Sequence, residues 1–432
     1  MNWRAVLLFA AIGAIFVAIG LNETWRYALT LLNMGLISAI MALGVNMQWG
    51  YAGLFNVGVV GFVALGGLSV VLVSMPPVPA AWAAGGLRVW GALLFGAAVI
   101  GGAIWLWRRL AAGKTRALAV TGVLAVGFFL FRAMFDPAVQ AIEAVDPAAT
   151  GYLGGLGLPV LFAWPVGGLI AAGAAWLVAK SALGLRSDYL AIATLGIGEI
   201  ILAMMKNEDW LTRGVKNVIG LPRPVPYEIE LQNSPTFVSR VESWGADPIA
   251  ASSVAVDLGY TLLFTMVLAV ILLGSELALR SPWGRMMRAI RDNEVAAEAM
   301  GKDVKRRHLQ VFVLGAAVCG IGGALLTTLD GQLTPASYNP LRFTFVIWVM
   351  VIVGGSGNNW GAVLGGLLIW FLWVEVENRG GEIMALLTSG LADGSALKIH
   401  LLDSVAHMRM LLMGIVLLVV MRFSPRGLIP EK

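Results

Sequence analysis

The sequence predicts an all-α polytopic membrane protein, and three features of its composition support this fold class. Hydrophobic residues make up 59% of the 432 residues, whereas charged residues make up only 13%. Soluble domains carry about 25% charged residues, so a globule of this size would have too little polar surface to stay in water. The 53 glycines also favour membrane helices, because small residues let helix backbones approach closely in lipid.

Twelve apolar segments meet or approach the roughly 20 residues that a helix needs to cross a bilayer. They are residues 4–21, 27–47, 54–74, 89–107, 117–135, 159–179, 188–205, 257–279, 309–328, 342–356, 357–376 and 408–421. The tenth and the last are short, and broken or re-entrant helices are allowed where the backbone is buried against protein. We expect the first segment to be a retained helix, and a cleaved signal peptide is the alternative.

Lysine and arginine gather in three segments that predict the orientation of the chain. Residues 108–116 carry four basic residues and no acid, and residues 280–307 carry eight. The tail adds Arg422 and Arg426. Because basic loops remain in the cytoplasm, twelve spans with both termini inside place all three segments on that side.

Residues that would support catalysis do not converge in the sequence. None of the three histidines belongs to a zinc-binding pair, and the single cysteine, Cys319, excludes an intrachain disulfide. The run Gly113-Lys114-Thr115 lacks the earlier glycine of a phosphate-binding loop, since position 108 is Arg. We therefore expect a transport permease rather than an enzyme, without a bound metal or cofactor and without a nucleic-acid partner.

The basic segment 280–308 predicts a short amphipathic helical element beneath the membrane. Ser281 and Pro282 are typical of a helix start, and Gly301 is typical of a helix end. One interpretation is an anchor for lipid headgroups. The other is a docking element for a cytoplasmic partner, which the acidic and small residues of the segment favour. The predicted docking residues are Arg285, Arg288, Arg291, Glu294, Ala297, Glu298 and Gly301.

Glu199 is the most unusual residue of the predicted spans. It follows Asp188 by 11 residues, which is about 16 Å along a helix and places it near the middle of the bilayer. A charge there costs about 2.5–3.5 kcal/mol on insertion scales, and such residues usually face the bundle interior or a cavity. Glu199 is either a pathway or gate residue, or a protonated or hydrogen-bonded clasp between helices.

Three further polar or flexible positions are candidates for the translocation path. Asn46 and Asn56 flank the second and third spans, where they either line the path or form packing hydrogen bonds. Gly355 lies in the glycine- and asparagine-rich run 354–359, which predicts a tight cytoplasmic turn near a gate.

Several motifs together resemble the M-type permease subunit of the bacterial high-affinity branched-chain amino acid ABC importer family. Glu294 to Gly301 looks like the coupling-loop signature of ABC importer permeases. The other stretches follow in the family's order: Leu43–Asn46 and Gly50–Leu54, Leu185–Ile200, Gly284–Gly301, Val353–Gly357 with Trp360-Gly361, and Pro425–Leu428.

The resemblance implies a subunit of a larger machine in the bacterial inner membrane. Its expected partners are a second related permease, two cytoplasmic ABC ATPases that hold ATP and Mg²⁺, a periplasmic substrate-binding protein and membrane lipid. The arginines of the coupling loop would pair with acids on an ATPase, whose closure would move the spans as rigid bodies. Gly301 would let the chain turn back into the ninth span.

Three segments complete the predicted domain organisation of this single permease domain. Residues 86–150 resemble an inserted helical hairpin on a family core of about ten spans, and 206–256 is expected to be a periplasmic loop. The outer stretch 378–407 is longer than the family's corresponding loop.

The expected function is ATP-driven import of branched-chain or similar amino acids into the cytoplasm. An ABC permease for urea or short amides is the alternative within the same machinery. An ion-coupled secondary transporter is a third possibility, but it would favour ionisable groups within the spans and would not need a docking loop.

Overall fold

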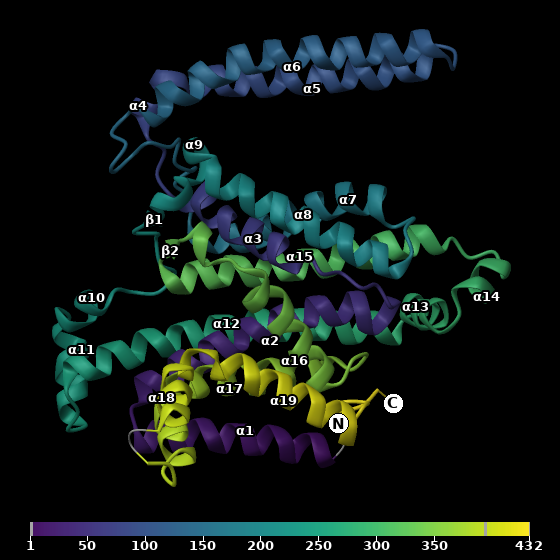
Figure 1. Cartoon of the computed structure of the whole chain (residues 1–432). Coiled ribbons are helices and arrows are strands. Elements are labelled where there is room, and N and C mark those ends of the chain that lie inside the picture. The colour runs from purple at the N-terminus through teal and green to yellow at the C-terminus, as the bar shows by residue number, and fades with distance from the viewer. Residues whose placement is uncertain (1–2, 393–394, 432) are drawn as a thin grey trace.

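The computed structural model describes residues 3–392 and 395–431, and it is a bundle of helices with two very short strands (Figure 1). Residues 1 and 2, Lys432, and residues 393–394 of the predicted outer stretch lie outside the described residues. In the described part, nine helices are long and apolar enough to cross a membrane, or ten if the bent pair α18 and α19 forms one span. The predicted all-α polytopic fold is confirmed.

Each of the twelve predicted spans overlaps a helix of the structure. The long helices are α1 (Trp3–Asn22), α2 (Trp25–Ala52), α5 (Leu87–Arg109), α6 (Lys114–Glu143), α7 (Ala163–Ala182), α8 (Ser187–Asn207), α12 (Pro248–Arg280), α15 (Val304–Asp330) and α17 (Asn359–Leu387). Shorter apolar helices are α3 (Val59–Ser74), α16 (Val346–Gly354), which follows the π-helical turn Leu341–Phe345, and α19 (Met408–Phe423).

The remaining elements are short and connect these helices. They are α4 (Pro79–Ala81), the π-helical turn Trp82–Gly86, α9 (Asp209–Thr212), β1 (Val218–Ile219), α10 (Glu228–Gln232), α11 (Pro235–Ser243), α13 (Pro282–Asp292), α14 (Glu294–Ala299), β2 (Gln332–Leu333) and α18 (Ala396–Asp403). Short 3-10 turns lie at Val160–Phe162, Gly214–Lys216, Pro335–Ser337 and Val405–His407. Strands β1 and β2 pair in antiparallel fashion, with Val218 opposite Leu333. This pairing ties the segment after α8 to the end of α15.

Several element boundaries differ from the sequence prediction. Helix α12 starts at Pro248, nine residues before the predicted span at 257, because Asp247 caps it by accepting a hydrogen bond from Ala250 N at 3.0 Å. Helix α17 continues to Leu387, into the stretch predicted as the outer loop 378–407. Helix α3 starts only at Val59, because the left-handed Gly53 (φ 68°) ends α2 before it.

Glycines set the closest contacts of the bundle core, where α15 packs against α7, α2 and α3. A Cβ atom at Gly66 of α3 would lie 1.8 Å from the carbonyl oxygen of Gly320 on α15. One turn along, a Cβ at Gly323 would lie 1.9 Å from the carbonyl oxygen of Val63. The two backbones therefore touch directly, which is the packing that a glycine-rich membrane bundle predicts.

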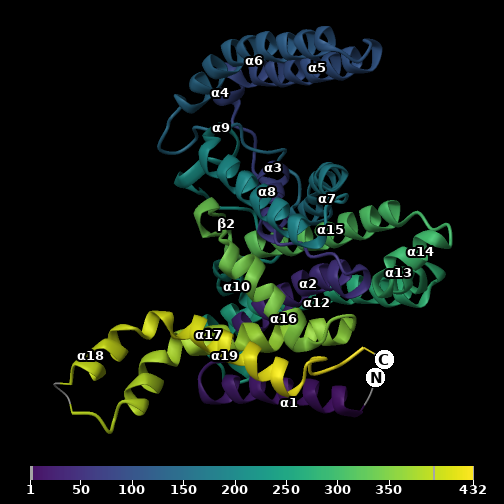
Figure 2. The ribbon, with the colours of Figure 1, turned by 45° about the vertical axis from the view of Figure 1, so that its right-hand side comes forward.

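The hairpin of α5 and α6 stands apart from the bundle (Figures 1 and 2). The two helices pack on each other, and most of their apolar side chains are exposed. A small hydrophobic cluster joins the base of the hairpin to the rest, through Trp210 and Leu153 among others. Both helices lie within the segment 86–150, and that this segment is an insertion stays a prediction.

The three basic segments lie at one end of the bundle. Figure 1 shows the turn between α5 and α6, the α13–α14 region and both chain ends on its right-hand side, opposite β1, β2, α10 and α11. This common side agrees with the charge pattern. That this end is cytoplasmic stays a prediction.

Candidate functional site

Helix α13 is an amphipathic element held against the bundle by its apolar face. Ser281 caps it by accepting a hydrogen bond from Gly284 N at 3.3 Å, and Pro282 occupies its first turn. Met287 and Ile290 are buried in the core, whereas Arg285 on the other face is exposed. The predicted start of the helical element is therefore confirmed, and α13 packs on α12 and α2.

A break at Asn293 divides the predicted single helical element into α13 and α14. Asn293 has an extended backbone (φ −156°, ψ 97°), and its side chain caps α14 by accepting a hydrogen bond from Ala296 N at 2.9 Å. Asparagine favours such local caps over a continuous helix. Gly301 (φ 74°) ends the element in the left-handed conformation, and Asp303 then caps α15.

Helix α14 lies at the end of the bundle (Figure 2), and most of its side chains are exposed. Glu294 and Glu298 are exposed, and the apolar Val295 and Met300 are 77% and 79% exposed. Only Ala297 is half-buried, and it packs against the core. Exposed apolar side chains flanked by acids are typical of a protein-docking surface.

The three arginines of α13 do not share one environment. Arg285 is exposed and donates to the carbonyl oxygen of Arg280 at 3.2 Å. Arg288 is half-buried and donates to the carbonyl oxygen of Leu279 at 3.3 Å. Of the three arginines, Arg285 alone is exposed to solvent.

Arg291 has its partners within this chain. It donates to the carbonyl oxygen of Gly50 at the end of α2 and forms an ion pair with Glu431 at 2.8 Å. Sequence reasoning did not single out Glu431, because the two residues lie 140 positions apart and no motif links them.

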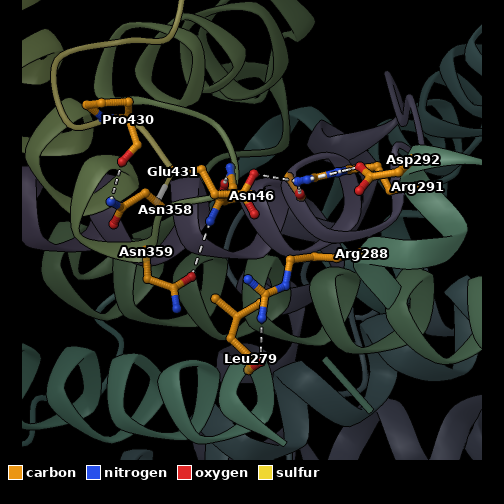
Figure 3. Close-up of polar contacts among 11 residues, drawn as sticks. Asn46, Leu279, Arg288, Arg291, Asp292, Asn358, Asn359, Pro430 and Glu431 are labelled. Carbon is orange, nitrogen blue, oxygen red and sulfur yellow. Dashed lines mark hydrogen bonds and ion pairs between the residues drawn. The ribbon is translucent and has the colours of Figure 1, made fainter. Parts of the chain in front are cut away.

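The predicted turn 354–359 joins α16 to α17 next to α13 (Figure 3). Gly355 has a φ of 121°, which favours glycine. Asn358 caps α17 by accepting a hydrogen bond from Trp360 N at 3.0 Å. The structure therefore confirms the predicted tight turn and places it beside α13, which belongs to the segment 280–308 predicted to be the coupling loop.

Asn46 and the turn belong to one buried polar network. Asn46 accepts a hydrogen bond from Gly357 N at 2.8 Å and donates to the side-chain oxygen of Asn359 at 3.2 Å. The Tyr51 hydroxyl donates to the same oxygen of Asn359, whose amide nitrogen donates to Glu276 at 3.1 Å. The network connects α2, α12 and α17 close to the coupling loop.

Asn56 lies in a second buried network, away from the first. Its amide donates to the side-chain oxygen of Gln48 at 2.8 Å, and its side-chain oxygen accepts from Gly58 N at 2.9 Å. Gln48 in turn donates to the carbonyl oxygen of Phe312 on α15 at 2.8 Å. These contacts hold the extended segment between α2 and α3 in place.

Glu199 is not brought together with Asn46 or Asn56. Helix α8 packs on α3 through its other face, where Gly198 approaches Gly58. The Glu199 side chain is exposed and shares its face of α8 with the exposed Ile192 and Ile200. Glu199 therefore faces away from this bundle, because packing on α3 turns that side of the helix outward, and its role in the translocation path or as a clasp between helices stays a prediction.

Two cavities adjoin the coupling loop. One, of about 280 Å³, lies among Glu276, Arg288, Asn359 and Glu431. The other, of about 510 Å³, lies among Arg291, Ser356 and Arg426. Within residues 3–392 and 395–431, no group of three or more His, Cys, Asp or Glu residues is arranged to hold a metal ion.

Comparison with known proteins identifies several relatives. The chain is 28% identical over 291 residues to the high-affinity branched-chain amino acid transport system permease protein LivM of Escherichia coli, covering 65% of this chain and 64% of that protein. It is 25% identical over 399 residues to the probable branched-chain amino acid transport permease protein LivM of Methanocaldococcus jannaschii, covering 91% and 90%. It is 31% identical over 112 residues to the probable permease protein LivH of that organism, covering 26% and 35%.

The relation to a family rests on a separate comparison, with a model of the family. No solved structure matches the chain. The family described as "Branched-chain amino acid transport system / permease component" matches residues 115–421, which is well over half of the chain. The matched range includes α13, α14 and the turn 354–359. It also includes the residues of α12, α15 and α17 that take part in the two buried networks. The chain therefore belongs to the family of branched-chain amino acid transport system permease components.

Proposed function

We propose that this chain is the membrane-spanning subunit of an ATP-driven ABC importer that moves branched-chain or similar amino acids into the cytoplasm. The observation that most supports this proposal is the exposure of Val295 and Met300 at α14, which lies at the same end of the bundle as the other basic segments. Family membership supports the substrate class. The chain itself binds no cofactor in this proposal, and ATP and Mg²⁺ bind to separate ATPases.

Helix α14 is the proposed contact for one of two cytoplasmic ATPases. Its exposed apolar side chains would enter a groove of the ATPase, while Glu294 and Glu298 at the rim would select basic partners. Arg285 would pair with an acid at the edge of that groove. Ala297 and Gly301 are the small residues that let α14 lie close to the bundle and turn into α15.

The exposed Glu199 supports a second membrane subunit beside α8. A charged group near the middle of the bilayer costs about 2.5–3.5 kcal/mol, so a protein surface that hydrogen-bonds it is more stable there than lipid. A related permease packed on the face of Ile192, Glu199 and Ile200 would supply that cover. Glu199 would then lie at the boundary between the two chains, where substrate passes.

The opposite end of the bundle is the proposed delivery side. The segments α9 to α11 and the β1–β2 pair form a folded platform there, and Trp244 and Ile219 are exposed on it. A periplasmic substrate-binding protein would dock on this platform and release the amino acid toward the membrane.

The proposal is tested by purifying the tagged chain gently at native abundance and identifying the bound proteins by mass spectrometry. We expect two ABC ATPases and a sibling permease in stable amounts. Substitution Val295→Asp should release the ATPases and abolish uptake of branched-chain amino acids, because it places a charge in the apolar contact. Val215→Asp is the matched control, since Val215 is similarly exposed near the other end of the bundle.

Two results would contradict the proposal. One is recovery of the chain alone, active in liposomes under an ion gradient, which would make it a secondary transporter. The other is unchanged ATPase binding and uptake in the Val295→Asp variant.

A further inference from the structure

Residues 424–431, here called the tail segment, fold back onto the turn between α16 and α17. The amide of Leu428 donates to the carbonyl oxygen of Val353 at 2.9 Å, and the amide of Ile429 donates to that of Gly354 at 2.9 Å. The side chain of Asn358 in the turn donates to the carbonyl oxygen of Pro430 at 3.1 Å. Three hydrogen bonds therefore fix the tail segment along the last residues of α16 and the turn, and Figure 3 shows the one between Asn358 and Pro430.

Glycines allow this contact to be backbone against backbone. A Cβ atom at Gly427 would lie 2.3 Å from Gly355 Cα, and a Cβ at Gly355 would lie 2.3 Å from the carbonyl oxygen of Ile429. Both glycines have positive φ, which a side chain would strain. The tail segment is thus seated on the turn without space for adjustment, and the two must move together.

The other end of the tail segment holds the coupling loop. Glu431 forms the 2.8 Å ion pair with Arg291 of α13, and the same Arg291 nitrogen donates to the carbonyl oxygen of Gly50. The two side chains are 24% and 28% exposed, so the pair is shielded from solvent more than an ordinary surface pair. Partial shielding strengthens an ion pair relative to one in open water.

Two cavities adjoin this contact between α13 and the turn. The two cavities described above, of about 280 and 510 Å³, both reach Glu431 and Arg288. The apolar face of α13 packs on α2 and α12, so its direct link to the turn is the Arg291–Glu431 pair, and the hydrogen bond of Arg291 to Gly50 adds a polar link to the end of α2.

We propose that the tail segment is a strap that transmits movement of the coupling loop to the α16–α17 turn, with Arg291 and Glu431 as its positioning residues. The proposal rests on the proposed function, because an ATPase must move α13 and α14. In this arrangement Arg291 does not meet the ATPase. It passes the displacement of α13 to α2 through Gly50 and to α16 and α17 through the tail segment.

The test measures how much amino acid is taken up per ATP hydrolysed, separately from how much ATPase is bound. Glu431→Gln keeps the size of the side chain but removes its charge, and Glu431→Asp keeps the charge. Asp136→Asn is the matched control, because it also breaks a single ion pair, that of Asp136 with Arg132 at 2.9 Å, but on the remote hairpin. The complexes are reconstituted in liposomes with the binding protein, and three quantities are measured: bound ATPase, ATP hydrolysis and amino acid taken up per ATP hydrolysed.

We expect Glu431→Gln to retain its ATPases and its hydrolysis, while uptake per ATP falls about fivefold, as expected for losing a contact of about 1 kcal/mol. Glu431→Asp should restore most of the ratio, and Asp136→Asn should not change it. Unchanged uptake per ATP in Glu431→Gln would overturn the proposed role of the tail segment but not the proposed function. Loss of bound ATPase from that variant would also overturn that role, since the tail segment would then serve assembly. Absence of ATPases from the unmodified chain would overturn both proposals.

Discussion

Asn359 joins three helices through one side chain. From the start of α17 it accepts hydrogen bonds from Asn46 and Tyr51 of α2 and donates to Glu276 of α12. Asn359 is fully buried, and its side-chain oxygen is the acceptor for both the Asn46 amide and the Tyr51 hydroxyl, whereas Glu276 also pairs with Arg280 at 3.6 Å. A buried polar group without a partner costs about 1–3 kcal/mol, which makes this one amide important for the stability of the end of the bundle that carries the coupling loop.

Substitution Asn359→Ala should therefore lower the thermal stability of the purified protein. It leaves the Asn46 amide and the Tyr51 hydroxyl without their acceptor, which is expected to cost about 2–4 kcal/mol in total. The measurement is the unfolding temperature in detergent. Asn378→Ala is the control, because Asn378 is exposed and makes one hydrogen bond, to the Tyr27 hydroxyl. Equal unfolding temperatures for the two variants would show that the network does not stabilise the fold.

For a single residue, the sequence predicts its position along a helix but not which side of the helix faces the bundle. Counting residues from Asp188 predicts how far Glu199 lies along its helix, because the rise per residue is fixed. Which side of α8 faces the bundle depends on where Gly198 meets Gly58, and that contact involves a residue far away in the chain. The partner of Arg291 was unpredictable for a similar reason, because Glu431 lies 140 positions away in the chain.

The crossing of α3 and α15 shows how single atoms limit the packing of whole elements. Both helices use glycine where their backbones meet, at Gly66 with Gly320 and at Gly323 with Val63. Close backbone contact replaces the hydrophobic driving force that is missing between helices in lipid. The glycine content of the sequence predicted such packing, but not which glycines meet.

Substitution Gly66→Ala should prevent normal packing of these two helices. The added Cβ would lie 1.8 Å from a backbone oxygen, which cannot move without shifting α15. Overpacking in a tight core costs about 1–3 kcal/mol or more, so we expect lower expression and a lower unfolding temperature in detergent. Gly101→Ala on α5 is the control, because its Cβ would meet no atom within 4 Å. If both variants behave alike, the crossing is looser than the structure indicates.

Local signals predicted element ends well where the cap lies in the sequence itself. Ser281 with Pro282, and Gly301, were identified as the start and end of the coupling element, and both positions were correct. The break at Asn293 was missed, since asparagine is tolerated within many helices and its capping role depends on the backbone it adopts. The extension of α17 to Leu387 was also missed, because charged residues near its end resemble a loop.

For the whole molecule, hydrophobicity predicted where the helices lie, and charge predicted which loops share a side. Every predicted span overlaps a helix, and the three basic segments gather at one end. Both properties follow from the lipid environment. Segments that cross lipid must be apolar helices, and basic loops remain on one side of the membrane. The separation of the α5–α6 hairpin from the bundle required the structure, since its composition matches that of the core helices.

The orientation of the molecule can be tested by labelling introduced cysteines from outside with a membrane-impermeant maleimide. Cysteines replacing Ala112 and Ala299, which are exposed in the hairpin turn and on α14, should be protected in intact spheroplasts and should react after lysis. Cysteines replacing Ala246 and Ser389, exposed at the other end, should react in intact spheroplasts. The unmodified chain is the control, because its single cysteine, Cys319, is buried.

The position in the hairpin turn makes this experiment decisive for the span count. If α5 and α6 both cross the bilayer, the single crossing of α5 brings position 112 to the side of position 299, so both cysteines must be protected. The side of 299 itself does not depend on the hairpin, because α6 crosses back. Reaction of the cysteine at 112 from outside, with that at 299 still protected, would mean that the hairpin does not cross the bilayer as two spans. The basic residues of its turn would then contact the outer surface, against the bias that places such residues inside.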